Sequence, residues 1–304
     1  MKRKALVIAL FTVFAGSALA QQPVPVIATA PLEAAPQQDG AAAAPLQSSG
    51  PVIVKRDDQA FLRGMTAKAK KEYPRAVSEF SAAAASGHTE AQYLLGLMNL
   101  RGDGVKADIK QAITWFEMAL IHNHPLAATQ LGDLYEHGNG VAKNPAMAAT
   151  LYEKAAVIGF APAQTKLGAL YENGVGVPES PQSALDWYSL AAAQGYWDAQ
   201  HRLGKLLRDG RTGEFEYQES LRLFEASAKG GNAFAMVSLG DLYETGRGVV
   251  RNLAKAAQYY RQAAKEGEPA GRTRLATLGK VPAEPKQKAP VMVKLVKLSK
   301  APSP

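Results

Sequence analysis

The sequence predicts an all-α solenoid made of five consecutive helical pairs, each 36 residues long. Three sets of residues recur at this interval. The first is a central glycine in each unit: Gly96, Gly132, Gly168, Gly204 and Gly240. The second is a glycine six residues later: Gly102, Gly138, Gly174, Gly210 and Gly246. The third is a pair of large side chains whose second member is always aromatic: Trp115-Phe116, Leu151-Tyr152, Trp187-Tyr188, Leu223-Phe224 and Tyr259-Tyr260.

Before these repeats, the chain begins with the features of an export signal. Lys2, Arg3 and Lys4 precede an uncharged apolar run, and Ala18-Leu19-Ala20 places small residues at a cleavage site. We therefore expect residues 1–20 to be a signal peptide that is cut after Ala20. An uncleaved anchor is the alternative, but an apolar run of about 15 residues is short for the roughly 20 that span a bilayer.

Residues 21–55 are rich in alanine, proline and glutamine and show no helical or strand period, so they predict a disordered linker. Residues 56–90 predict a capping helical hairpin, with Tyr73-Pro74 at its turn and Ala76 and Phe80 facing inward. A hairpin of this kind would seal the first end of the stack, because a repeat buries its apolar face only against a neighbour.

The repeat domain is expected over residues 91–279. Its units are 91–126, 127–162, 163–198, 199–234 and 235–270, followed by a short cap at 271–279. Residues 280–304 carry six lysines, one glutamate and several prolines, and predict a disordered basic tail. The alternative for this tail is a short amphipathic turn on an anionic surface, with Val291, Leu295 and Leu298 on one side.

Each unit is interpreted as two helices joined by a glycine-rich turn. Gly138 and its equivalents supply the left-handed residue that ends the first helix. A capping residue begins the second helix in four units: Asp108, Asn144, Ser180 and Asn252. The central glycine costs about 1 kcal/mol within a helix, and we interpret its recurrence as a close approach of two helix backbones.

Charge and composition exclude several classes of function. The formal net charge of +8 comes from residues 1–20 and 280–304, so the remaining residues are neutral and offer no basic face for nucleic acid. The absence of cysteine excludes disulfides, thiolate metal sites, a cysteine nucleophile and N-terminal lipidation. His122-Asn123-His124 has a spacing that could hold a metal, but a solvated loop between units is favoured. No catalytic motif is present, so we expect no enzymatic activity, no cofactor and no metal.

The repeat motif, which reads AQTKLGALYENGVGV at residues 163–177, resembles the Sel-one-like repeat family, a branch of the tetratricopeptide superfamily. The resemblance implies a right-handed superhelix of antiparallel helix pairs, whose concave face binds a protein or peptide. Several members of this family are adaptors or regulators in the bacterial periplasm. The fourth unit departs from the motif, because Thr212 and Gly213 replace the turn residues and Glu216 replaces the cap. This turn is expected to be the softest in the solenoid, as a hinge or as a contact loop.

The resemblance also implies that the first, fourth and fifth residues after each central glycine face the binding surface. These candidate residues are Leu97, Arg101, Asp133, Glu136, His137, Glu172, Asn173, Lys205, Arg208, Asp241 and Glu244. Units two, three and five would then be acidic and unit four basic, which favours a basic or mixed-charge partner segment. The alternative is an ordinary solvated face.

The predicted function is that of a periplasmic or secreted adaptor or regulator. It would bind another envelope protein, such as a sensor or a secretion component, without binding nucleic acid. The basic tail would add at most weak contact with a membrane surface or cell wall. The alternatives are a factor associated with envelope polysaccharide or peptidoglycan, and a secreted effector that binds host proteins.

Overall fold

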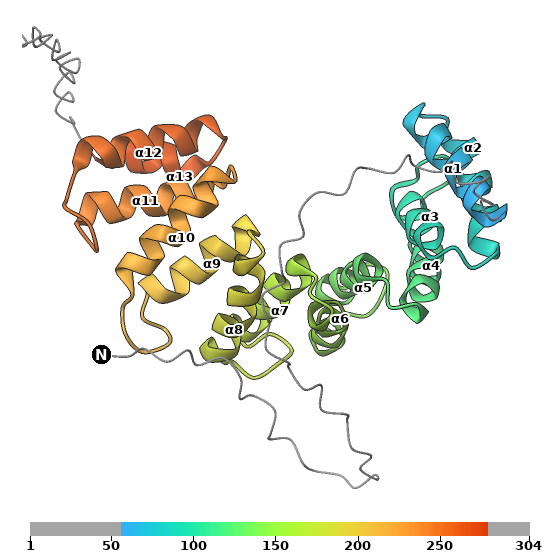
Figure 1. Cartoon of the computed structure of the whole chain (residues 1–304), viewed down its shortest axis with the longest axis horizontal. Coiled ribbons are helices and arrows are strands. Elements are labelled where there is room, and N and C mark those ends of the chain that lie inside the picture. The colour runs from blue at the N-terminus through green and yellow to red at the C-terminus, as the bar shows by residue number, and fades with distance from the viewer. Residues whose placement is uncertain (1–55, 279–304) are drawn as a thin grey trace, which may run out of the picture. The chain divides into compact units, whose positions relative to one another are not determined.

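A computed structural model describes residues 56–278; the predicted signal peptide, the linker at 21–55 and the tail at 280–304 lie outside the described residues. Within this range the chain forms thirteen α-helices and no strand (Figure 1). The helices are α1 Arg56–Ala69, α2 Tyr73–Ala85, α3 Thr89–Arg101, α4 Ile109–Ile121, α5 Pro125–His137, α6 Pro145–Val157, α7 Ala161–Asn173, α8 Pro181–Ala193, α9 Trp197–Arg208, α10 Tyr217–Lys229, α11 Ala233–Thr245, α12 Leu253–Lys265 and α13 Pro269–Thr277.

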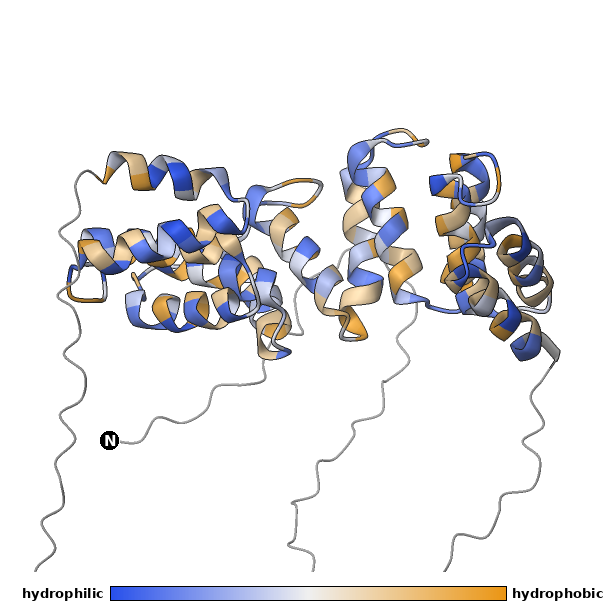
Figure 2. Cartoon of the chain, turned by 90° about the horizontal axis from the view of Figure 1, so that it is seen from above, coloured by the Kyte–Doolittle hydropathy of each residue, from blue (hydrophilic) through white to orange (hydrophobic). Residues whose placement is uncertain are grey.

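The helices pack in the order in which they occur along the chain. Each unit pairs a first helix with a second one, as α5 pairs with α6, and each second helix packs on the first helix of the next unit. First helices of neighbouring units also contact each other, α5 with α7, α7 with α9 and α9 with α11. In Figure 2, hydrophobic and hydrophilic residues alternate around the helices, as expected where one side packs and the other meets solvent. The predicted α-solenoid is confirmed.

The predicted turns and caps follow from local chemistry. Gly138 has φ +77° and ends α5, as the left-handed C-cap requires. All four predicted caps accept a bond from a free N–H at the start of a second helix; for example, Asn144 Oδ1 accepts from Met147 N at 3.0 Å. Glu216 forms no side-chain cap at α10.

Histidine also caps two first helices, which the sequence interpretation missed. His124 Nδ1 accepts from Ala127 N at 3.2 Å, and its Nε2 lies 2.9 Å from a Glu90 carboxylate oxygen. The ring also stacks on Tyr93. The expectation that His124 lies in a solvated loop was therefore wrong, because its side chain is only 11% exposed.

The central glycines have a different role from the one expected. A Cβ at Gly132 would lie 2.4 Å from Cε1 of Tyr152, whose ring belongs to the second helix of the same unit. The same relation holds for the other four units and for Gly64 with Phe80 in the N-terminal hairpin. The expected approach of two backbones was wrong: each glycine makes room for a fully buried aromatic ring.

The N-terminal hairpin of α1 and α2 buries Ala76 and Phe80 as expected. Its turn lies earlier than predicted, at residues 70–72, between the end of α1 at Ala69 and the start of α2 at Tyr73. Pro74 is instead in the first turn of α2, where its missing N–H is not needed. No helix in the range 56–278 is both long enough and apolar enough to cross a bilayer.

Candidate partner-binding surface on the first helices

The candidate residues lie on α3, α5, α7, α9 and α11, and we call the face they share the first-helix surface. Arg101, His137, Asn173 and Lys205 are exposed on it. Glu172 is the exception, because it is only 8% exposed and does not behave as a solvated surface residue. Its burial shows that at least one predicted binding residue has a role inside the fold.

The acidic candidates are bound by tyrosines of the second helices. The Tyr152 hydroxyl lies 2.5 Å from Asp133 Oδ1 and 2.7 Å from Glu136 Oε2, so its single hydrogen is shared between two carboxylates. Unit five repeats this arrangement, with Tyr260 lying 2.7 Å from Asp241 Oδ1 and 2.6 Å from Glu244 Oε2.

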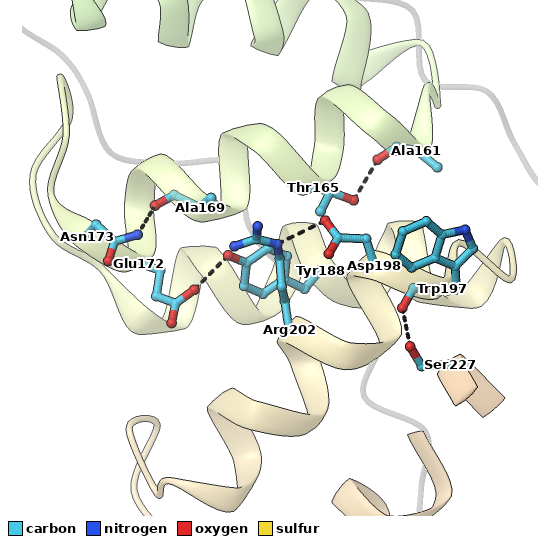
Figure 3. Close-up of polar contacts among 10 residues, drawn as sticks. All are labelled: Ala161, Thr165, Ala169, Glu172, Asn173, Tyr188, Trp197, Asp198, Arg202 and Ser227. Carbon is cyan, nitrogen blue, oxygen red and sulfur yellow. Dashed lines mark hydrogen bonds and ion pairs between the residues drawn. The ribbon is translucent and has the colours of Figure 1, made fainter. Parts of the chain in front are cut away.

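In unit three, Tyr188 donates to Glu172 Oε2 at 2.7 Å (Figure 3). Burial, with the adjacent carboxylates, raises the pKa of Tyr152, Tyr188 and Tyr260 well above the ordinary value. The three hydroxyls therefore remain protonated donors at any physiological pH.

A cation from the following first helix completes each of these sites. Lys166 Nζ lies 2.8 Å from Asp133 Oδ1, and Arg274 Nε lies 3.2 Å from Asp241 Oδ1. In unit three, Figure 3 shows the Arg202 guanidinium beside the Tyr188 hydroxyl. Each cation comes 34 residues after the central glycine of its unit, so these contacts join neighbouring units.

Units one and four lack this arrangement because their buried ring is a phenylalanine without a hydroxyl. In unit one, Leu97 and Leu100 are partly buried and pack against the core. In unit four, the Arg208 guanidinium lies 5.9 Å from the centroid of Phe224, a cation–π contact, and pairs with Asp209. Tyrosine thus occurs in the units that carry an acid at the first or fourth residue after the central glycine, and phenylalanine in those that do not.

Removing the Tyr152 hydroxyl tests whether these contacts stabilise the stack. Tyr152→Phe is expected to lower the free energy of unfolding by about 1 kcal/mol, because it removes a hydrogen bond to a carboxylate while the ring still fills the core. Urea denaturation measures the change. In an Asp133→Asn/Glu136→Gln background the same substitution should cost less; an equal cost in both backgrounds would show that the carboxylates are not the partners.

The first-helix surface has shallow cavities between neighbouring units. One of about 300 Å³ is lined by residues that include Glu136, Lys166, Tyr196 and Arg202. One of about 290 Å³ lies between α9, α11 and α13 and is lined mainly by charged residues, among them Arg208, Asp209, Asp241, Glu244, Arg247 and Arg274. A third, of about 550 Å³, includes the apolar Leu100, Ile109 and Leu134. Residues 56–278 contain no cluster of acidic and histidine side chains that could hold a metal ion.

Sequence reasoning placed the candidate residues on the correct helices but missed their internal partners. Lys166, Arg202 and Arg274 were not identified, although each follows a unit that has both a tyrosine and an acid. Gln130 and Ser238 take the same position after the phenylalanine units. A cation thus follows each tyrosine unit and a neutral residue follows each phenylalanine unit, and this pattern could have been detected in the sequence.

Stacked helical pairs with paired side chains between units define an α-helical repeat protein. The model of the Sel1 repeat matches residues 89–124, 125–156, 161–196, 197–232 and 233–268, which is more than half of the chain. The chain therefore belongs to the Sel1 repeat family, as its motifs predicted. Repeats of this family generally act as scaffolds for protein–protein interaction.

Two of the solved structures that are similar to this chain show the likeness. One is a Sel1 repeat protein from Oxalobacter formigenes, with a TM-score of 0.68 and 27% identity, over 73% of this chain and 90% of that one. The other is c5321, a protective antigen of uropathogenic Escherichia coli strains, with a TM-score of 0.67 and 30% identity. That match covers 73% of this chain, which spans about half (48%) of c5321. No protein with a curated description matches the chain.

Proposed function

We propose that this protein is a non-catalytic adaptor or regulator that binds a partner protein or peptide on the first-helix surface. The observation that carries the proposal is the direct contact between successive first helices, α5 with α7, α7 with α9 and α9 with α11. This contact makes one continuous surface from several units, and the cavities lie on it. A partner segment could therefore touch several units at once.

The place of action in this proposal is the periplasm or the exterior of a bacterium, and the partner is another envelope protein. Support for the location is the sequence pattern of residues 1–20. A factor bound to envelope polysaccharide or peptidoglycan and a secreted effector remain the alternative functions. The family's general role as an interaction scaffold favours a protein partner over both a glycan and a catalytic substrate.

Site-specific photo-crosslinking in cells tests the proposal. A photoreactive residue is placed at Arg101 or His137 on first helices, and at Glu117 or Glu153, which are exposed on second helices, as matched controls. We expect one discrete protein to be crosslinked from both first-helix positions and from neither control. Crosslinks of equal strength from the second helices, or to abundant bystanders alone, would contradict the proposal. Sedimentation of the unmodified protein with purified cell wall would favour the glycan alternative.

A further inference from the structure

Unit four carries a charge on the first-helix surface that the fold itself does not use. Lys205 directly follows a central glycine, the position that Asp133 and Asp241 occupy in their units. Those aspartates pair with Lys166 and Arg274 of the next first helix, whereas the equivalent residue after Lys205 is the neutral Ser238. Lys205 is exposed and forms no ion pair within residues 56–278.

The other charged side chains of α9 have partners, as do the two acids of α11 named above. On α9, Asp198 binds Arg202 with an Oδ2–Nε distance of 3.0 Å, and Arg208 binds Asp209 at 2.8 Å. On α11 and α13, Asp241 is held by Arg274 and Tyr260, and Glu244 by Tyr260. Among the charged side chains of α9, Lys205 is therefore the one without a partner.

An exposed aromatic ring packs on the residue one helical turn before this lysine. Phe234, in the first turn of α11, is 56% exposed. Its ring stacks on His201 with a centroid distance of 6.2 Å, and His201 lies one helical turn before Lys205 on α9. At the equivalent position, the other units carry Glu90, Leu126, Pro162 and Asp198. Among the first helices of the five units, α11 alone thus places an aromatic ring there.

We propose that Lys205 and Phe234 select the partner, and that the partner segment carries an aspartate or glutamate beside an apolar side chain. This inference rests on the proposed function and specifies the partner's chemistry. It departs from the expectation of a basic or mixed-charge partner, because the acids that suggested one are bound to tyrosines and to cations of the fold. The partner's carboxylate pairs with the free ammonium group, and its apolar side chain covers the exposed ring.

A displayed library of random 16-residue peptides, selected on the purified full chain, tests the inference. We expect the recovered peptides to share an acidic residue with an apolar neighbour. Fluorescence anisotropy should then show at least about tenfold weaker binding to Lys205→Glu and to Phe234→Ala, and weaker binding in high salt. Lys154→Glu, an exposed charge reversal on α6, and Phe215→Ala, an exposed aromatic truncation in the unit-four turn, are the matched controls and should bind normally.

The other possible outcomes distinguish a failure of this inference from a failure of the proposed function. Peptides that bind elsewhere on the first-helix surface, with no effect of Lys205→Glu or Phe234→Ala, would overturn this inference and leave the proposed function intact. Basic peptides whose binding depends on Glu136 or Glu244 would also overturn this inference and leave the proposed function intact. Failure to enrich any peptide, or binding lost only with the two control variants, would contradict the proposed function as well.

Discussion

Gly132→Ala is expected to lower the free energy of unfolding by about 3 kcal/mol. Alanine is normally the better residue within a helix, by about 1 kcal/mol, so helix propensity alone predicts the opposite sign. The new Cβ, however, would lie 2.4 Å from the buried Tyr152 ring. The ring would have to move within a close-packed core and away from Asp133 and Glu136, and overpacking of this kind typically costs 1–3 kcal/mol before the lost hydrogen bonds are counted.

Urea denaturation followed by circular dichroism measures this change. Gly132→Ala combined with Tyr152→Leu serves as the control, because the smaller side chain leaves room for the new methyl group. In that background the alanine should cost much less than in the natural one. A single alanine variant as stable as the unaltered protein would show that the ring does not pack on Gly132.

Lowering the pH from 8 to 5 is expected to reduce stability by about 2 kcal/mol through His201 alone. Burial is the main cause that lowers the pKa of His201 from 6.5 to about 4, and Arg202 and Lys205 add to the effect. The unfolded chain therefore binds a proton between about pH 6.5 and pH 4 that the folded chain does not, so stability falls with pH across this window. The imidazole sits between α9 and α11, where its Nε2 lies 3.2 Å from Ser238 Oγ.

The His201→Gln variant isolates this contribution, because glutamine does not titrate and its amide can still reach Ser238. Urea denaturation at pH 8 and pH 5 should show a pH dependence about 2 kcal/mol smaller in the variant than in the unaltered protein. An identical pH dependence in both proteins would mean that His201 titrates normally in the folded chain.

The repeating fold could be predicted from sequence because its signals are local. A capping residue such as Asn144 acts on an N–H three residues away, and Gly138 needs only its own backbone angle to end α5. The 36-residue period then multiplies each local signal five times. The caps of four second helices and the glycine ends of four first helices were consequently correct. In unit four the prediction was wrong, because α9 ends with Asp209 as its C-cap, one residue before Gly210. The turn before Tyr73 and the histidine caps were also missed.

The contacts between helices could not be predicted in the same way. Tyr152 meets Asp133 across 19 residues, and Lys166 meets Asp133 across 33, so their proximity depends on how helices pack. The glycine had two physical explanations, a neighbouring backbone or a neighbouring ring, and only the packing of the second helix distinguishes them. The acids expected on the partner-binding surface are thus hydrogen-bonded to tyrosines of the second helices.

The contacts of the fourth unit with its neighbour could not be predicted from the sequence either. Its turn lacks a side-chain cap at Glu216, as expected, but Arg211 reaches back to unit three. There its Nη2 lies 2.5 Å from Glu179 Oε1, and its Nη1 lies 3.7 Å from Glu172 Oε1. The altered turn therefore exchanges a local cap for contacts with its neighbour. That this turn is the softest in the solenoid, as a hinge or as a contact loop, remains a prediction.

Nuclear magnetic resonance of the deuterated full chain tests the central claim that the first helices bind the partner. The probe is the tightest peptide from the library selection. We predict that its addition shifts amide signals of α7, α9 and α11, centred on Lys205, and leaves those of α6, α8 and α10 essentially unchanged. Shifts confined to the second helices would contradict this account of how the protein binds its partner.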